Sequence, residues 1–517
     1  MFVFFENELT NAFALLLAFF VHLYFRFKYS YWSSSGVPGP VPVAPYGNLE
    51  DVIKRRAQFF QPYADAYFKY RHLPYVGMYA FSEPVLNVHD PDLAKLILIT
   101  HFDHFQAHGI FSPGDRDSLS DHIFNAHGSR WRRLRHKLTP AFSSVKLKGA
   151  MPVINDITDS AIKYIDDLHS KDEPINISQF YEKFTMEIIG NVGFGVVCDG
   201  FKNNKSEFVF YGHDFEPKFL ISCYYAFILI YALHCRSIIR LIGFFAPKVL
   251  KVFSLKRVRK ETEHFFKNFL KEMVEYRQRN NYQREDYLQT LINLKDANEV
   301  ESEFTQKDLY ANIMIYMFAG YETSATTGQF AIFELACNPL IQDRARVEIR
   351  QVLEKHNGKV TYEALKEMTY LNMIIDETMR KYPPMRALFR RCTRDYLIPG
   401  TNVTIEKGTL IFIPIQAIQM DPEYFPNPQE FQPERFSPGN KKKLHPCVWM
   451  PFGEGPRKCL GVRQGYLQSK MSLVRLLMKY EMILDKRTEV PVRNKVGALG
   501  NASNTGIWIP KRLLLEM

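Results

Sequence analysis

The most apolar segment of the chain lies at its N-terminus. From Ala12 to Phe25 the residues are apolar except for His22, and the basic residues Arg26 and Lys28 follow this run. A spanning helix needs about 20 residues, so the span would extend from about Leu9 to Phe27. Basic residues on the C-terminal side predict that the start of the chain lies outside and the bulk of it in the cytosol. A buried core helix is the alternative interpretation.

A proline-rich stretch, "GVPGPVPVAP" at 36–45, follows the apolar run. Proline fixes φ and lacks an amide hydrogen, so this stretch is expected to be a stiff extended spacer rather than a helix. The sequence therefore predicts a membrane anchor at residues 1–28, a proline-rich hinge at 29–47 and one large domain at 48–517.

Helical periodicity dominates the large domain. Asn48 is a candidate cap for an amphipathic helix that runs to about Tyr70, and Asp90 with Pro91 starts another helix. Short strands are expected at 75–81 and 85–89, and again around "YLIPGTNVTI" and "GTLIFIPI" beyond residue 383. The pattern predicts a mainly α protein with small β-sheets (α+β) and no internal linker.

An internal apolar segment, residues 219–245, allows three interpretations. Its uninterrupted part ends at His234 and Arg236, which is short for a second membrane span. A fully buried helix would have the same composition. The third possibility is an exposed apolar patch that dips into the bilayer beside the anchor.

The longest predicted helix runs from Thr305 to Cys337. Thr305 is a candidate N-cap with Asp308 three residues on, and about 32 residues at 1.5 Å each span roughly 48 Å. Its middle, "AGYETSATT" at 319–327, contains Gly320, which lowers helix propensity and leaves room against the backbone. Burial of Glu322 in this apolar helix would raise its pKa. A tolerated glycine and a solvated acid are the plainer interpretation.

Charge and cysteine content narrow the class of protein. The net charge of +11 favours an acidic partner or an anionic membrane surface, and no nucleic-acid-binding signature accompanies it. The seven cysteines include no C-x-x-C pair, which argues against a disulfide framework and a zinc ribbon. Three histidines, His101, His104 and His108, lack the spacing of a zinc site.

One cysteine stands in an unusual loop, "PFGEGPRKCLG" at 451–461. Cys459 precedes an amphipathic helix, where free amide hydrogens stabilise an anion, and Arg457 and Lys458 add positive charge. A thiolate is therefore the expected state. No partner motif for a nucleophilic cysteine is present, so a thiolate metal ligand is favoured, and a single axial thiolate indicates haem.

The other charged residues of interest do not indicate a particular function by themselves. Glu377 and Arg380 share a helix face, as do Trp131 and Arg135, and such patterns are usually solvated surface. Arg435 stands in a loop with no evident structural need of it.

Five short motifs in order resemble the cytochrome P-450 superfamily. "FGEGPRKCLG" is similar to its haem-binding loop, "AGYETS" to its oxygen-activation motif, "ETMR" to its E-x-x-R, "PERF" to its meander and "WRRLR" to its W-x-x-x-R. The run "LTPAFSSVKLKGAMPVIND" further resembles the microsomal clan of vertebrate family-3 and invertebrate detoxification enzymes. Gly465 departs from the family, which usually has Ala at this position.

The resemblance implies the cytochrome P-450 fold, haem b (iron protoporphyrin IX) and a set of residue roles. Cys459 would be the axial ligand of the haem iron, and Thr323 with Glu322 would relay protons during dioxygen activation. The residues implied around the cofactor are Phe452, Arg457, Trp131, Arg135, Gly455, Gly461, Gly320 and Ala319, with Arg386 as a further propionate candidate. Glu377, Arg380 and Arg435 would form a buried structural network. Substrate contacts would come from Ile123, Phe124, Phe318, Met385, Leu388, Phe389 and the apolar segment.

The implied function is a monooxygenase that inserts one oxygen atom into a lipophilic xenobiotic, steroid or fatty acid. Electrons would come from NADPH through a partner NADPH-cytochrome reductase, with cytochrome b5 as a further partner, at the endoplasmic reticulum membrane. A complementary basic face would comprise Arg132, Arg133, Lys137, Lys441 to Lys443, Lys458 and Arg463. The alternatives are a haem-thiolate isomerase or dehydratase acting on lipid peroxides, and a non-catalytic membrane-anchored haem protein.

Overall fold

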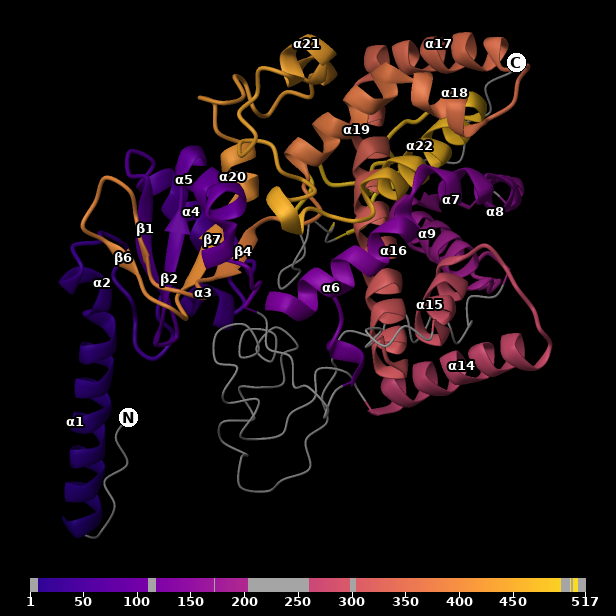
Figure 1. Ribbon diagram of the computed structural model, residues 1–517. Coiled ribbons are helices and arrows are strands. Elements are labelled where there is room, and N and C mark those ends of the chain that lie inside the picture. Colours follow the sequence, from indigo (N-terminus) through magenta and orange to yellow (C-terminus); the bar gives the residue numbers. More distant parts are fainter. Residues whose placement is uncertain are drawn as a thin grey trace.

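The computed structural model describes residues 8–109, 118–171, 173–202, 260–297, 304–493, 503 and 505–509. The expectations for the apolar segment 219–245 lie outside these residues. Helices dominate, and the four-stranded sheet lies toward the end of the body from which the first helix, α1 (Glu8–Tyr29), projects (Figure 1). The expected mainly α fold with small sheets is therefore confirmed.

The longer helices are α1 (Glu8–Tyr29), α6 (Gly128–Leu138), α8 (Met151–Ser170), α9 (Ile177–Phe194), α14 (Lys260–Arg279), α15 (Tyr287–Asp296), α16 (Gln306–Cys337), α17 (Pro339–Lys355), α19 (Thr369–Lys381) and α22 (Val462–Lys479). The shorter ones are α2 (Tyr31–Ser34), α3 (Glu50–Ile53), α4 (Gln61–Lys69), α5 (Pro91–Lys95), α7 (Ser144–Gly149), α18 (Tyr362–Glu367), α20 (Ile415–Gln419) and α21 (Pro438–Lys441). A π-helical turn occupies Leu96–Thr100, directly after α5.

The main sheet has the strand order β1-β2-β7-β4. Its strands are β1 (Tyr75–Ala80), β2 (Glu83–Val88), β4 (Leu388–Arg391) and β7 (Leu410–Ile413). β1 and β2 form the expected antiparallel pair, whereas β2 and β7 are parallel. Two-stranded sheets join β3 (Ile175–Asn176) to β8 (Trp508–Ile509) and β5 (Tyr396–Leu397) to β6 (Thr404–Ile405).

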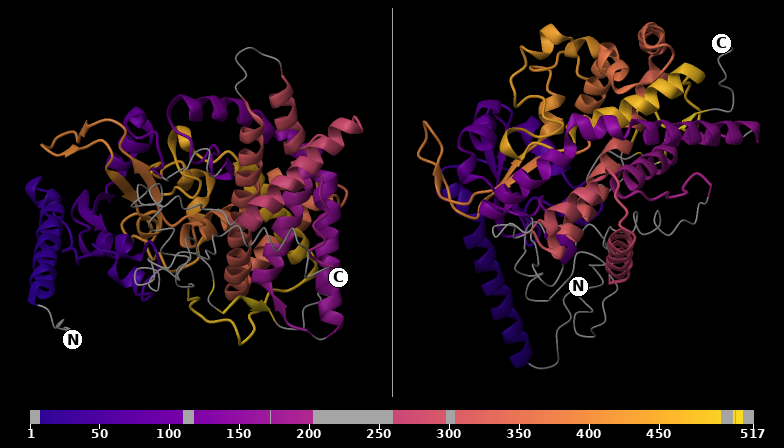
Figure 2. Two further views of the ribbon diagram at one scale, coloured as in Figure 1. Left: turned by 90° about the horizontal axis from the view of Figure 1, so that it is seen from below. Right: turned by 45° about the vertical axis from the view of Figure 1, so that its right-hand side comes forward.

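Helix α16 crosses the centre of the helical body in both views of Figure 2. Its start is a capping box: the Thr305 hydroxyl accepts from the Asp308 amide at 3.1 Å, and the Thr305 amide donates to the Asp308 carboxylate at 2.9 Å. The sequence predicted this start and the end at Cys337 correctly. Helix α9 packs along α16 with the ring of Tyr181 against Gly328, where an added Cβ would lie 2.1 Å from the ring.

One predicted helix is wrong. In place of a helix from Asn48 to Tyr70, the chain forms the separate helices α3 and α4. Asn48 makes no cap, because its side-chain oxygen accepts from the Tyr79 amide at 2.7 Å and its amide group donates to the Pro40 carbonyl at 3.3 Å. A tertiary contact with β1 has taken the hydrogen-bonding capacity that a cap would use.

Helix α1 projects from the body on the side of the main sheet (Figure 1). Its stretch Asn11–Tyr29 is long and apolar enough to cross a membrane, and that stretch is not buried in the protein. Large apolar side chains along it, including Phe13 and Leu15, are exposed. This is the pattern expected of a membrane anchor.

Candidate functional site

The middle of α16 has one accessible face, although most of the helix is buried. Ala319 and Glu322 are exposed, and Phe318, Gly320 and Thr323 are partly exposed. Residues three and four apart share a helix face, so Phe318, Ala319, Glu322 and Thr323 form one stripe. The Thr323 hydroxyl donates to the Ala319 carbonyl at 2.7 Å. This stripe places an acid and a hydroxyl beside the apolar side chains of Phe318 and Ala319.

Two expectations for this stretch change. Glu322 is exposed, so the burial that was expected to raise its pKa is not present. The space left by Gly320 is filled by another helix, because an added Cβ would lie 2.4 Å from the Cδ1 atom of Ile189 in α9. Glycine is needed here for the close approach of α9.

The loop before α22 folds tightly on itself and on its neighbours. The Cys459 amide donates to the Phe452 carbonyl at 2.9 Å, which closes the loop. Gly455 has a φ of +76°, and an added Cβ would lie 1.9 Å from the Leu98 carbonyl oxygen, so only glycine fits. The Phe452 ring packs on Tyr466, with 5.5 Å between ring centroids. These contacts place Cys459 just before the N-terminus of α22.

The Cys459 side chain is accessible, yet protein atoms surround it closely enough that burial raises the pKa of its thiol. Both observations fit a thiol that opens into the interior rather than onto the outer surface. The Gly461 amide and the Arg135 charge lower the pKa, but they do not outweigh burial. Lys458 pairs with Glu454 at 2.7 Å instead of acting on the sulfur. Burial therefore opposes the expected thiolate when no metal ion is bound, and a bound metal ion would stabilise it.

Three guanidinium groups converge beside this loop. Arg135 of α6 donates to the Lys458 carbonyl at 2.7 Å, Arg390 of β4 is 1% exposed, and Arg457 lies 4.5 Å from the centroid of the Trp131 ring. Burial lowers the pKa of Arg390 to about 10 and, together with repulsion from Arg390 and Arg135, that of Arg457 to about 9. Within the part of the chain that the structure describes, no carboxylate forms an ion pair with any of the three. We call them the cationic cluster.

His108 adds a neutral ring to the cationic cluster. Its Nδ1–H donates to the Phe124 carbonyl at 2.8 Å, and Nδ1 lies 3.5 Å from Nη1 of Arg457. Burial, together with the charges of Arg390 and Arg457, holds the pKa of His108 well below its ordinary value. The ring is therefore neutral at pH 7.

Sequence reasoning missed both Arg390 and His108. It proposed Arg386, whose guanidinium instead bonds Gln416 of α20 and, at 3.4 Å, Gln61 of α4. Arg386 precedes β4 whereas Arg390 lies in it, and only the placement of β4 decides which arginine reaches the cluster. The pairing of β4 with β7, Leu388 opposite Ile413, fixes that placement.

The arrangement fits haem b. A buried cationic cluster without carboxylates requires an anionic partner, and two propionates would supply the charge. A single cysteine sulfur next to a helix start can serve as an axial thiolate. The accessible stripe on α16 provides a face with a hydroxyl and an acid in otherwise apolar surroundings. The cationic cluster, the cysteine sulfur and the stripe on α16 are therefore three separate features that match haem b.

The expected substrate residues do not all face the same way. The Ile123 amide donates to the Asn312 side chain of α16 at 3.0 Å, which ties this loop to the central helix. Leu388 lies within 3.5 Å of the Cβ position of Gly453, beside the cysteine loop. Phe389 is 4% exposed and packs among His108, Phe124 and Phe412. It therefore packs against Phe124 from the core, and its expected contact with substrate stays a prediction.

Glu377 and Arg380 are fully buried rather than on the surface. Their side chains form an ion pair at 2.7 Å, and Arg435 approaches Glu377 at 3.4 Å. The guanidinium of Arg380 also donates to the carbonyls of Gln419 and Pro428, at 3.0 and 2.8 Å. This Glu377 network ties α19 to the polar, proline-rich segment before the cysteine loop.

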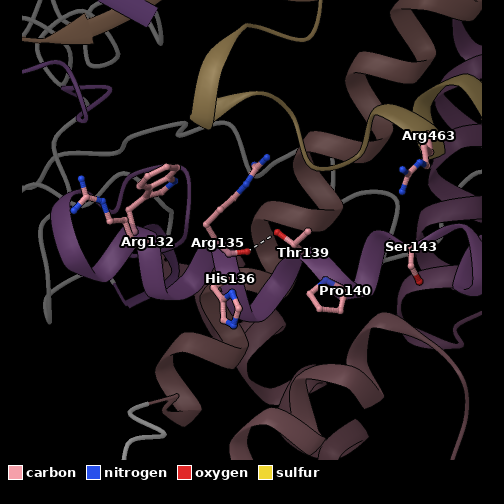
Figure 3. Close-up of a pocket in the computed structure, with 8 residues that line it drawn as sticks. Arg132, Arg135, His136, Thr139, Pro140, Ser143 and Arg463 are labelled. Carbon is pink, nitrogen blue, oxygen red and sulfur yellow. Dashed lines mark hydrogen bonds between the residues drawn. The ribbon is translucent and has the colours of Figure 1, made fainter. Parts of the chain in front are cut away.

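A cleft of about 610 Å³ lies along α6 on the outer side of this region (Figure 3). Arg132, Arg135, His136 and Thr139 line it from α6, and Arg463 reaches it from α22. The structure thus brings together two members of the expected basic face, Arg132 and Arg463. Lys441 instead turns inward and pairs with Asp376 at 2.5 Å.

A helical body with an accessible cysteine sulfur, a cationic cluster and a hydroxyl-bearing central helix defines a haem-thiolate protein. The family model described as Cytochrome P450 matches residues 37–509. The chain belongs to the cytochrome P450 family and is a cytochrome P450 monooxygenase. Its cofactor is haem b, and NADPH serves this class of enzyme through a reductase.

Curated relatives cover nearly the whole chain. "Probable cytochrome P450 6a20" of Drosophila melanogaster is 35% identical over 501 residues, which are 95% of this chain and 96% of the relative. "Cytochrome P450 6B1" of Papilio polyxenes is 35% identical over 96% of this chain and 98% of its own. "Cytochrome P450 6k1" of Blattella germanica is 32% identical, with 96% of each chain covered. The resemblance inferred from the motifs is thereby confirmed.

Proposed function

We propose that this enzyme oxidises lipophilic molecules with Cys459 as the axial ligand of its haem iron. The observation that carries the proposal is the pairing of an accessible thiol at the start of α22 with the cationic cluster beside it. When bound, haem supplies the activation of dioxygen that this class of enzyme uses. The protein's own residues hold the cofactor, admit the substrate and deliver protons.

Each group of residues has its own task in this proposal. Arg135, Arg390, Arg457 and the Trp131 N–H hold the propionates, and His108 contributes a neutral ring to the same site. Phe452 packs beside the sulfur. Thr323 and Glu322 stand on the accessible stripe of α16, where the hydroxyl can pass a proton inward from the acid. Ile123, Phe124, Phe318, Met385 and Leu388 contact the substrate.

Electrons are proposed to arrive from a reductase that docks on the cleft along α6. Arg132, Arg463 and the remaining basic residues near it would meet an acidic surface. The Arg463→Glu variant is expected to raise the KM for reductase while leaving the carbon-monoxide spectrum unchanged. Lys355→Glu, a charge reversal on the exposed end of α17, is the control. Equal effects of the two variants would contradict docking at this cleft.

The membrane anchor is proposed to hold the catalytic body on the cytosolic side of the endoplasmic reticulum. Cytochrome b5 is a further proposed partner of the same basic surface. Retention of the full chain in carbonate-washed microsomes, with the body open to added protease, is the expected result. Release by carbonate would contradict the anchor.

The axial ligand is tested with the reduced carbon-monoxide difference spectrum. The wild type and Cys337→Ala, a cysteine control distant from the loop in sequence, are expected to give a strongly red-shifted Soret band. Cys459→Ala is expected to lose it. A red-shifted band in Cys459→Ala, or its absence from freshly folded wild type, would overturn the assignment.

Turnover separates the monooxygenase from an isomerase that needs no external electrons. Product formation is expected to require NADPH and reductase. Thr323→Ala is expected to keep consuming NADPH while forming several-fold less product, because the relay is broken. Activity on lipid peroxides alone would favour the isomerase, and the presence of both Glu322 and Thr323 argues against it.

A further inference from the structure

The residues at the end of the membrane helix pack against the main sheet. Only Ser30, which has helical backbone angles (φ −82°, ψ −12°), separates α1 from the single-turn helix α2. The chain is therefore close to continuously helical from residue 8 to residue 34. Trp32 in α2 is 2% exposed, although it follows a helix whose apolar side chains face outward.

Trp32 sits directly over Gly77 of β1. An added Cβ at Gly77 would lie 2.3 Å from Cγ of the indole, so any side chain there would expel it. The indole N–H donates to the Met78 carbonyl at 2.9 Å, and the Trp32 amide donates to the Tyr79 hydroxyl at 2.9 Å. Shape and hydrogen bonding both fix this residue in one position.

Further contacts extend the joint on both sides of Trp32. The Tyr79 hydroxyl donates to the Tyr29 carbonyl at 2.9 Å, and the two rings lie 5.0 Å apart. The Tyr29 hydroxyl accepts from the Gly47 amide at 3.1 Å. Gly39, in the proline-rich stretch, also packs closely against Gly77, since a Cβ added at Gly39 would lie 1.9 Å from the Gly77 carbonyl oxygen. The segment 29–47 is therefore packed against the sheet and not a free tether.

We propose that Trp32 over Gly77 is a joint that fixes the membrane helix to the sheet and thereby sets one orientation of the catalytic body on the lipid surface. This inference rests on the proposed role of α1 as a membrane anchor. A flexible linker would let the body sample many orientations. Here the angle of α1 to β1 is determined by a buried side chain.

The experiment measures the linear dichroism of haem absorption in oriented lipid bilayers that contain the full-length holoenzyme. A single orientation of the body gives a strong dichroism, whereas a tethered body gives little. Trp32→Ala and Gly77→Val are expected to lose most of it. Trp508→Ala and Gly439→Val are the matched controls: Trp508 lies in β8, and an added Cβ at Gly439 meets nothing within 4 Å.

A second variant covers the case in which Trp32→Ala fails to fold. Two glycines inserted after Ser30 leave Trp32 in its place but uncouple α1, and this variant is expected to lose the dichroism with an unchanged carbon-monoxide spectrum. Unchanged dichroism in this insertion variant, or absence of dichroism in the wild type, would overturn the joint. Carbonate extraction of the wild type is scored separately, so that failure of the anchor is distinguished from failure of the joint.

Discussion

Two groups of buried arginines differ in whether the folded protein supplies a carboxylate to balance their charge. Arg380 is fully buried and pairs with Glu377, so its charge is compensated by the fold itself. Arg390 is 1% exposed, and its guanidinium donates to the Phe389 carbonyl at 2.8 Å without any carboxylate among the described residues. The Glu377 network is complete when the chain folds. In our proposal, the cationic cluster gains its anionic partner only when the cofactor binds.

This difference explains how folding and haem retention are linked. A buried charge is strongly unfavourable unless a partner of opposite charge compensates it. Arg390 and Arg457 carry this cost, since burial lowers the pKa of both guanidinium groups. If haem propionates bind here as proposed, they would offset this cost, and relief of the repulsion would contribute to the affinity for the cofactor.

The largest expected effect is that of Arg380→Met. This change leaves Glu377 buried without its principal partner, and with Arg435 at 3.4 Å as its remaining cation, which should lower the free energy of unfolding by about 3–5 kcal/mol. Denaturant titration followed by circular dichroism measures it, with the haem-free protein compared in both forms. A loss below about 1 kcal/mol would contradict a compensated network.

The same substitution at Arg390 should have the opposite sign in the haem-free protein. Arg390→Met removes an uncompensated charge, so the free energy of unfolding should stay constant or rise by about 1–4 kcal/mol. Haem transfer to an acceptor protein should become about 10–100 times faster, because a charged hydrogen bond to the propionate is lost. Arg391→Met, the next residue in β4, is the control. Destabilisation of the haem-free protein by Arg390→Met would overturn the comparison.

Acid pH should lower the stability of the haem-free protein through His108, which lies beside the cationic cluster. His108 has a lowered pKa in the folded protein, so the unfolded chain takes up a proton first as the pH falls below about 6.5. Stability should therefore be unaffected at pH 7 and should fall on acidification, by at most about 1.4 kcal/mol per pH unit for this group. His108→Gln should flatten the slope between pH 6.5 and 5. Burial also lowers the pKa of His89, to about 4, and His89 contributes equally to the pH dependence of stability in the wild type and in His108→Gln.

The smallest expected effect belongs to Arg435. It approaches Glu377 at 3.4 Å but is not the principal partner, which is Arg380. Arg435→Gln should lower the free energy of unfolding by about 1 kcal/mol. Thermal unfolding of the holoenzyme measures this change, and a loss as large as that of Arg380→Met would mean that the two arginines share Glu377 equally.

Local signals in the sequence predicted the long elements well. The limits of α16 followed from Thr305, Asp308 and Pro339, because a capping box and a terminal proline act within a few residues. The antiparallel pair β1 and β2 and the start of α5 at Asp90 also followed from turn and cap chemistry. The helix proposed from Asn48 failed because Asn48 bonds to a strand about 30 residues away.

The candidate site was predictable to the extent that it consists of motifs. Cys459, Thr323 and Glu377 were proposed from short patterns, and the family match now supports the resemblance that these patterns suggested. The position of Arg390, rather than Arg386, beside Arg457 was not predictable, because both are arginines in the same short stretch. Phe389 and Gly320 were likewise assigned to the cofactor or substrate side, although their principal contacts are with the core.

The sequence by itself determined the class of chemistry, since a cysteine loop, a hydroxyl-bearing helix and an apolar N-terminus are each local in the chain. Tertiary structure decided which charges are compensated, how strongly burial acts on the Cys459 thiol, and how the N-terminal helix is joined to the sheet. These properties depend on burial and on partners distant in sequence. A residue's own neighbours in the chain do not specify the dielectric around it or the group that completes its charge.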